Sequence, residues 1–280
     1  MAGVERVRNQ KSMQEVLVQA AAHARKEQRY QQGGFEFFSL AGHILESSCK
    51  HLDGVECLRC KYSSELSLAE LPEMVFPRNT LTIHFIGTSS FIEFNCLDAL
   101  KMVSESLPDV KVGASSVWQS ARKDRIQQIT EQHKPFDWTY TTHYKGSEHS
   151  CKVETSTDRI DMERLKRRDA ITFSSSVTLF EDELADHGIA QLSARIRVMD
   201  GGYFFVLLRF YMRVDNVLVR VCDTRIVGND NDRHVIREWQ LREAKYENLH
   251  HVDSEFLLDI DRAWMYLPII EEQVDRISAE

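Results

Sequence analysis

The densest group of potential metal ligands in the sequence is an acidic turn at residues 181–187. The carboxylates of Glu181, Asp182, Glu183 and Asp186 precede the imidazole of His187. Such a group could hold a divalent cation for metal-dependent hydrolysis. Adjacent acids in a turn do not converge on one point, however, and their spacing is not that of a calcium-binding loop. We therefore expect an internal ion-pair layer with nearby arginines, and a metal-dependent hydrolase is the alternative.

A second group combines thiols and imidazoles. Cys57 and Cys60 form a CxxC motif, with Cys49, His43 and His51 close by in the sequence. A structural zinc ion uses ligands of this kind. Only one CxxC motif is present and the other residues have no standard zinc spacing, so we interpret these cysteines as ordinary reduced thiols. The sequence therefore predicts no cofactor and no metal ligand.

Three antiparallel strands are predicted across residues 191–225, and they must position the polar side chains of this part of the chain. Glycine and Asp/Asn turns separate apolar alternating runs, which is the pattern of consecutive hairpins. A three-residue loop at 200–202 pairs Met199 with Tyr203. This register keeps one face of the first two strands continuously apolar.

The second hairpin of this meander produces an anomaly. A two-residue Asp-Asn turn pairs Val214 with Val217, which makes Leu208 face Asp223. Asp223 and Arg225 then interrupt an apolar row that should face the core. A local rule broken in this way is often the mark of a functional site.

The remaining pattern predicts an α+β fold. Two packed antiparallel β-sheets, with the 191–225 meander central, are expected to be flanked by helices at 96–104, 158–168 and 241–279. A chain of 280 residues is long enough for one large domain. Residues 1–34 are polar and Gln-rich and predict an N-terminal helical extension that stops at a Gly-Gly pair. Residues 35–280 form the single globular domain.

Composition excludes several classes of protein. The formal net charge is −8, whereas nucleic-acid binding needs a basic surface. No apolar run approaches the roughly 20 residues of a membrane helix. The N-terminus lacks the apolar core of a signal peptide. Six cysteines in so long a chain do not look like a disulfide scaffold. We expect a monomer in the cytoplasm, with the nucleus as a second location.

An aromatic and β-branched stretch at residues 134–146 predicts a strand. Trp138, Tyr140 and Thr142 share one of its faces. Aromatic side chains with polar tips suit the wall of a peptide-binding groove, and they equally suit an ordinary half-buried strand. The residues alone leave both interpretations open.

Several sequence blocks are specific enough to identify relatives. They include DWTYTT at 137–142 and FEDEL at 180–184, and the full set covers residues 71–76, 92–100, 134–146, 179–188, 195–199, 207–210 and 223–225. In order and spacing these blocks resemble the TIPRL (TOR signalling pathway regulator-like) family. The resemblance covers about two-thirds of the chain.

The resemblance implies a function. Members of this family are not enzymes; they bind catalytic subunits of type 2A and related protein phosphatases and inhibit or remodel them within TOR signalling. They hold the acidic C-terminal tail of the phosphatase in a cleft. Family residues that face the phosphatase correspond here to Asp98, Ile160, Val221 and Asp223.

A tail-capture mechanism assigns further roles. Arg197 or Arg225 would pair with the tail carboxylate, and Trp138, Tyr140 and Val221 would contact its aromatic side chains. Arg225 could instead pair with Asp223 two residues away. Burial and full internal pairing of Asp223 would exclude its role at the rim of a cleft. A scaffold that binds through its N-terminal helix is a third hypothesis.

Overall fold

The computed structural model describes residues 26–49, 51, 56–68, 70–103, 110–112, 132–134 and 139–280. Two antiparallel sheets of five and eight strands dominate the fold, and a short ribbon pairs β6 (Val110–Val112) with β7 (Gln132–Lys134). This architecture confirms the predicted α+β class with two antiparallel sheets. None of the described helices is long and apolar enough to cross a membrane.

The five-stranded sheet comes mostly from the N-terminal part of the chain. Its order is β1 (Lys26–Gln32), β2 (Phe35–Ala41), β4 (Thr80–Phe85), β5 (Phe91–Asn95) and β8 (Ser147–His149). The turn between β1 and β2 requires glycine, because Gly33 has a φ of 56° and a Cβ there would lie 2.4 Å from the Cα of Asp230. This hairpin therefore packs tightly onto the larger sheet.

The eight-stranded sheet contains the predicted meander. Its order is β3 (Met74–Val75), β10 (Ile171–Asp182), β11 (Gly188–Met199), β12 (Tyr203–Val214), β13 (Leu218–Asn229), β14 (His234–Lys245), β15 (Ile269–Ala279) and β9 (Cys151–Thr155). The strands β8 and β9 belong to different sheets, and Ser150 alone separates them. The two sheets are therefore joined covalently at one corner.

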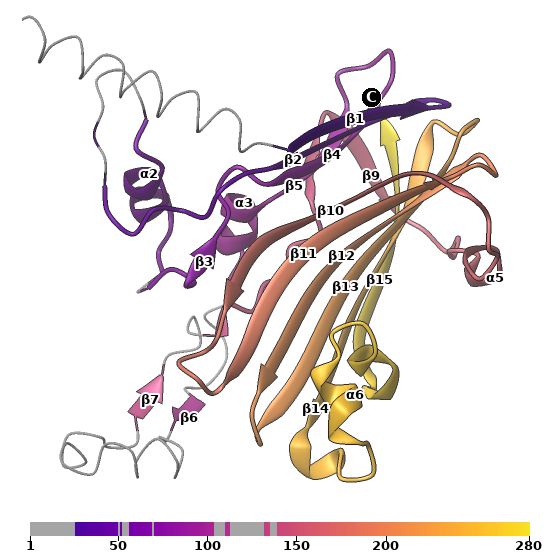
Figure 1. Ribbon diagram of the computed structural model, residues 1–280. Helices are drawn as coiled ribbons and strands as arrows, with labels where there is room; N and C mark the ends of the chain where they lie inside the picture. The colour runs from indigo at the N-terminus through magenta and orange to yellow at the C-terminus, as the bar shows by residue number, and fades with distance from the viewer. Residues whose placement is uncertain are drawn as a thin grey trace, which may run out of the picture.

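Short helices lie on both sides of the larger sheet. On the side of the smaller sheet are α2 (Leu58–Glu65) and α3 (Cys96–Lys101), and on the other side are α5 (Met162–Leu165) and α6 (Ser254–Leu258) (Figure 1). Two 3₁₀ helices, η3 (Tyr246–Asn248) and η4 (Ala263–Tyr266), flank α6 in the chain. We call the side of the larger sheet that faces the smaller one its inner face, and the opposite side its outer face.

Aromatic side chains fill the space between the sheets. Phe35 and Phe37 of β2 contact Phe204 of β12 edge-on, with ring centroids 4.9 and 4.8 Å apart. All three are essentially inaccessible to solvent. Edge-to-face pairs at these distances stabilise a core beyond the area that they bury.

The register of the meander is confirmed in its first hairpin and wrong in its second. Met199 pairs with Tyr203 as predicted. The second loop contains three residues, so Val214 pairs with Leu218 and Leu208 with Thr224. Asn216 adopts a left-handed conformation (φ 59°), which suits a three-residue hairpin loop. The shift by one residue moves Asp223 and its alternating neighbours to the outer face.

Two predicted helical regions are strands. The expected helix at 241–279 is replaced by the end of β14, three short helical turns and the long strand β15. In β15, pairing with β14 and β9 stabilises the strand more than the helix preference of its Glu and Gln residues stabilises a helix. The predicted N-terminal helix cannot reach Gly33, since residues 26–32 form β1. Residues 1–25 of that extension lie outside the described residues. The helices expected near 96–104 and 158–168 are present as α3 and α5.

Candidate functional site

The outer face of the larger sheet brings together most of the predicted partner-binding residues. Val221, Asp223 and Arg225 alternate along β13 and pair in register with Tyr211, Arg209 and Leu207 of β12. Arg197 lies on the adjacent strand β11, opposite Phe205. Ile160 reaches the same face from the segment before α5, where its amide N–H donates to Oε1 of Glu238 at 2.8 Å. This face is therefore the candidate functional site.

Asp223 lies at the centre of a buried charge cluster. The guanidinium of Arg209 donates from Nε to Oδ1 and from Nη2 to Oδ2, both at 2.7 Å, and Nη2 of Arg225 donates to Oδ2 at 3.0 Å. Asp223 is 2% exposed. Burial alone would raise the pKa of this carboxyl, but the hydrogen bonds and charge of Arg209 outweigh it and hold the pKa below its ordinary value.

This pairing corrects the cleft-rim hypothesis. Asp223 is buried and fully paired inside the chain, which is the condition that excludes it from an exposed rim. Arg225 adopts the intramolecular alternative by pairing with Asp223. Both residues act in this structure by holding the strands and their charges in place rather than by facing a partner.

Arg225 also supports an aromatic residue at the surface. Its guanidinium carbon lies 4.9 Å from the ring centroid of Trp264, and that of Arg242 lies 5.3 Å from the same ring. Arg242 further donates to the carbonyl oxygen of Leu267 at 2.9 Å. Cation–π contacts of this kind hold the half-buried indole in one position.

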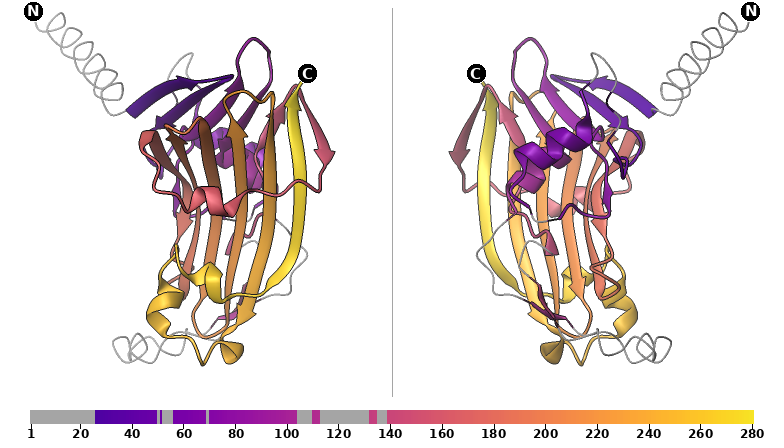
Figure 2. Two further views of the ribbon diagram at one scale, coloured as in Figure 1. Left: turned by 90° about the vertical axis from the view of Figure 1, so that its right-hand side faces the viewer. Right: turned by 90° about the vertical axis from the view of Figure 1, so that its left-hand side faces the viewer.

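A C-terminal cap, residues 246–268, covers one end of the outer face (Figure 2). It buries Val221 completely against a small cluster that also contains Tyr211, Val219, Leu249, Leu257, Ala263 and Leu267. The hydroxyl of Tyr211 donates to the carbonyl oxygen of Leu257 at 2.5 Å. Val221 is therefore a core residue beneath the cap and not the floor of an open cleft, as the sequence had suggested.

A strap, residues 156–168, crosses the other end of the outer face (Figure 2). The amide of Ser156 donates to the carbonyl oxygen of Val274, and Arg159 forms a bidentate pair with Glu272 at 2.8 and 3.2 Å. At its far end the guanidinium of Arg164 lies 4.0 Å from the ring centroid of Tyr203. These contacts bury Ile160, which is 6% exposed.

Between the strap and the cap, part of the sheet remains accessible. Arg197 is exposed, and Phe205 and Leu207 are half-buried. Arg195 is also half-buried and pairs with Asp261 of the cap at 2.7 Å. Among the predicted site residues that the structure describes, Arg197 is thus the cation best placed to meet a partner.

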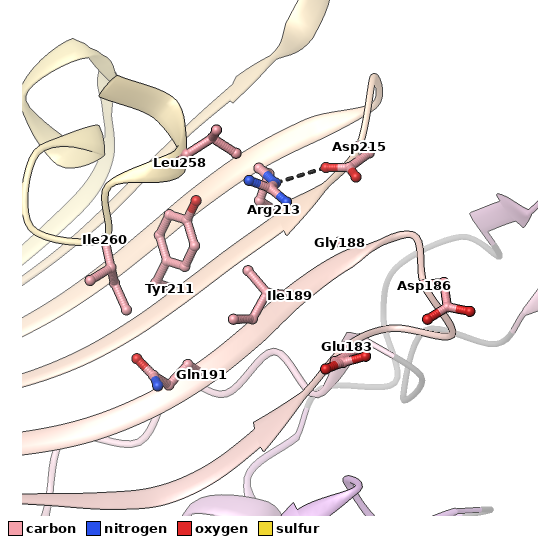
Figure 3. Close-up of a pocket in the computed structure, with 10 residues that line it drawn as sticks. All are labelled: Glu183, Asp186, Gly188, Ile189, Gln191, Tyr211, Arg213, Asp215, Leu258 and Ile260. Carbon is pink, nitrogen blue, oxygen red and sulfur yellow. Dashed lines mark ion pairs between the residues drawn. The ribbon is translucent and has the colours of Figure 1, made fainter. Parts of the chain in front are cut away.

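A pocket of about 520 Å³ lies beside the cap at the turn end of the same face (Figure 3). Its apolar lining comes from Ile189, Tyr211, Leu258 and Ile260. Its charged lining consists of Glu183, Asp186, Asp215 and Arg213, and Arg213 pairs with Asp215 at 2.7 Å. With three carboxylates and one guanidinium, the pocket suits an apolar or basic group better than an acidic one.

The acidic turn at 181–187 is used locally. The buried carboxylate of Asp182 accepts from the amides of Leu184 at 2.6 Å and Glu73 at 2.9 Å, and Glu181 accepts from Gln191. The expected pairing of this turn with the arginines of the meander is wrong. Those arginines pair with Asp223 and with acids of the cap and of β14 instead, as with Arg209 and Arg220.

Two other predicted residues lie on the opposite side of the larger sheet. Asp98 lies in the first turn of α3, where its carboxylate accepts from Asn95 at 2.8 Å and Ser147 at 2.5 Å. Tyr140 is buried between the sheets against Phe180, with a φ of 51°. Trp138 lies outside the described residues. Asp98 and Tyr140 therefore do not join the outer face.

Sequence reasoning missed one convergent group. The thiols of Cys49, Cys57 and Cys60 and the imidazole of His51 bring four donor atoms within 4.8 Å of one another. The CxxC spacing of Cys57 and Cys60 was the available signal, but it gave no indication that the other two ligands fold onto it. Three thiols and one imidazole are the donor set of a structural metal site.

Comparison with known proteins gives consistent results. The model of the TIP41-like family matches residues 74–250. A TIP41-like protein of Caenorhabditis elegans is 70% identical over 276 residues, which cover 97% of this chain and 98% of the relative. The TIP41-like protein of Homo sapiens is 42% identical over 221 residues, with coverage of 78% and 80%.

A yeast relative has a more informative name. The type 2A phosphatase activator TIP41 of Saccharomyces cerevisiae is 40% identical over 196 residues, which cover 64% of this chain and 54% of the relative. The matched family region contains β10 to β14 and the strap, and so most of the outer face.

Proposed function

This chain belongs to the TIP41-like family, and we propose that it is a non-enzymatic regulator that binds catalytic subunits of type 2A protein phosphatases. The observation that carries the proposal is the match over residues 74–250 together with yeast relatives that are named type 2A phosphatase activators. We place this activity in TOR signalling and in the cytoplasm.

The outer face is the surface that we assign to the phosphatase. It offers accessible apolar area at Phe205 and Leu207, an exposed guanidinium at Arg197 and the supported ring of Trp264. An interface with aromatic and arginine anchors on a rigid sheet loses little conformational entropy on binding. The buried cluster around Asp223 supplies that rigidity.

Capture of the phosphatase C-terminal tail is the finer part of the proposal. The tail carboxylate would pair with Arg197, because Arg225 is committed to Asp223. An apolar side chain of the tail would lie on Phe205, which faces Arg197 across the strand pair. The pocket beside the cap is a poor site for the tail carboxylate, since carboxylates dominate its charged lining.

A pull-down with purified proteins tests this function. The full chain would be incubated with a type 2A catalytic subunit, either complete or lacking its last few residues. We expect recovery of the complete subunit and at least tenfold weaker binding of the shortened one. The Arg197→Glu variant should show a similar loss with the complete subunit and little further loss with the shortened one.

Arg29→Glu provides a matched control, because Arg29 is an exposed arginine on the smaller sheet and its ion pair is with nearby Glu27. It should bind like the unaltered chain. Equal recovery of both forms of the catalytic subunit would overturn tail capture. Failure to recover either form would overturn phosphatase binding itself, and a phosphatase assay on the bound complex gives the direction of regulation.

A further inference from the structure

The loop before α2 and the first turn of α2 form a compact group of soft ligands. Cys57 is the residue before the helix and Cys60 lies in its first turn, so both thiols point toward the same end of α2. Cys49 and His51 come from the preceding loop. The four donor atoms lie within 4.8 Å of one another. Residues separated by up to eleven positions thus converge on one point.

The distances within the group match a tetrahedral zinc complex. Zn–S bonds of about 2.3 Å and Zn–N bonds of about 2.05 Å place two sulfur ligands about 3.8 Å apart and a sulfur and a nitrogen about 3.6 Å apart. In the structure the Sγ atoms of Cys49 and Cys60 are 3.6 Å apart, and Sγ of Cys60 is 3.9 Å from Nε2 of His51. An ion could therefore enter with small movements of the side chains.

We propose that Cys49, His51, Cys57 and Cys60 bind a structural Zn²⁺ ion that fastens the segment at residues 42–49 to α2. The family model begins at residue 74, so this site lies outside the region that defines the family. Four protein ligands leave no open position on a tetrahedral ion, which is typical of structural rather than catalytic zinc.

The surrounding structure explains why such a fastening is useful. The helix α2 has eight residues, and Tyr62 is its one buried residue. The N-cap position, Cys57, makes no side-chain capping hydrogen bond. The loop is tied to the helix by a hydrogen bond of 3.3 Å from Arg59 to the carbonyl oxygen of Glu46. A helix of eight residues is marginal by itself, and a metal ion at its first turn can stabilise it.

The charges around the site are also favourable. Binding converts three thiols to thiolates and releases three protons, which leaves a complex with a net charge of −1. The N-terminus of α2 lies beside that charge, and the cations Arg59 and Lys61 flank Cys60 in the sequence, although Lys61 also pairs with Glu56 at 3.4 Å.

A disulfide is the competing fate of these cysteines. The 3.6 Å separation of the Sγ atoms of Cys49 and Cys60 is far longer than the roughly 2.05 Å of an S–S bond. A disulfide would join two of the four ligands and leave His51 without a role. Zinc uses all four.

The test begins with the metal content of the full chain, purified under reducing conditions without chelator and measured by elemental mass spectrometry. We expect one zinc per chain. Exchange for Co²⁺ should produce the visible absorption and the thiolate-to-metal charge-transfer bands of tetrahedral cobalt. The Cys57→Ser/Cys60→Ser variant should lose both signals, whereas the matched control Cys151→Ser, at a half-buried cysteine elsewhere, should keep them.

A second measurement uses the unaltered chain, so that the test does not depend on whether the cysteine variants fold. Alkylation followed by peptide mass spectrometry should show Cys49, Cys57 and Cys60 protected by zinc and modified after chelation. Cys151 should react equally in both samples. The proposal is overturned if the chain binds less than one-tenth of an equivalent of zinc, if the double variant retains zinc, or if a Cys49–Cys60 disulfide forms and zinc does not alter alkylation.

Discussion

Asp223 and Cys60 each lie at the centre of a polar cluster, and the two clusters differ in what completes them. On the outer face, one carboxylate accepts three hydrogen bonds from two guanidinium groups of the same chain. At the start of α2, three thiols and an imidazole surround one another and include no cation. The first cluster is completed by cations of the same chain, whereas we propose that a zinc ion completes the second.

The difference also separates two kinds of evidence for function. A buried charge that is fully paired within the chain has a structural role, even at a position that a family resemblance marks as functional. Soft donors that converge on one point match the ligand set of a metal ion instead. The surroundings of a polar group are therefore more informative than its residue type.

The largest expected effect tests whether the Asp223 cluster is complete by itself. Asp223→Leu leaves Arg209, which is 4% exposed, buried without its carboxylate. We expect the free energy of unfolding, measured by urea denaturation, to fall by about 3–5 kcal/mol. The double variant Arg209→Met/Asp223→Leu should recover much of that loss. A single variant that loses less than about 1 kcal/mol yet no longer binds the phosphatase would return Asp223 to the partner interface.

The next effect concerns the cluster at α2. Free zinc at about 100 times its dissociation constant should stabilise the folded segment by about 2.7 kcal/mol and slow hydrogen exchange about 100-fold at amides that open with it. The amides of Lys61 and Leu66, which donate to Cys57 and Tyr62, report this change. Amides of β13 should exchange at the same rate with and without chelator. Equal exchange at Lys61 in both conditions would mean that no ion completes the cluster.

As the pH is lowered, the cluster at α2 should lose its zinc before the Asp223 cluster loses its charge. Protons compete with zinc for thiolates and imidazole, so zinc should dissociate at mildly acidic pH. The pKa of Asp223 is lowered in the folded chain, so its contribution to stability is fully present above the unfolded pKa of about 3.9 and is lost as pH falls further. Zinc release and unfolding, followed together during acidification, should be separate transitions. Coincident transitions would mean that the clusters are coupled.

The smallest effect tests how firmly the cap is attached to the outer face. Tyr211→Phe removes the hydroxyl that donates to the carbonyl oxygen of Leu257. We expect a loss of about 1 kcal/mol in the free energy of unfolding, since the aromatic ring stays buried. Zinc content should not change, because α2 lies on the other side of the larger sheet (Figure 1). Faster proteolysis within residues 246–268 would confirm that the bond holds the cap.

The sequence predicted the central meander well, whereas β1 and β15 were predicted as helix and the strand expected at 134–146 is not formed over residues 139–146. The glycines at 201 and 202 determine the first hairpin, and its register is correct. The predicted register of the second hairpin is wrong because apolar residues occupy both faces of β13. Val214 can pair with Leu218 as well as with Val217, so the apolar pattern does not choose between the two registers. Strand β15 lies in a region that was predicted to be helical, since its pairing with β14 is a tertiary effect that local residue preferences do not contain.

The sites were harder to predict than the sheets. The one-residue shift in β13 decides which face carries Asp223, and therefore whether it meets a partner or Arg209. The zinc ligands were visible in the sequence, but Cys49 and His51 have no regular spacing relative to the CxxC motif. Their convergence depends on how an irregular loop folds back onto α2. Local patterns do not contain that information.

The position of β9 has a consequence for synthesis of the protein. Thr155 pairs with Asp275 and Cys151 with Ala279, so β9 leaves the ribosome long before its partner strand. At roughly 5–20 residues per second, β9 remains unpaired for many seconds of translation. During that interval β14 also exposes an unpaired edge, which is a site for aggregation. The nascent chain should therefore depend on chaperones until β15 emerges and closes the sheet.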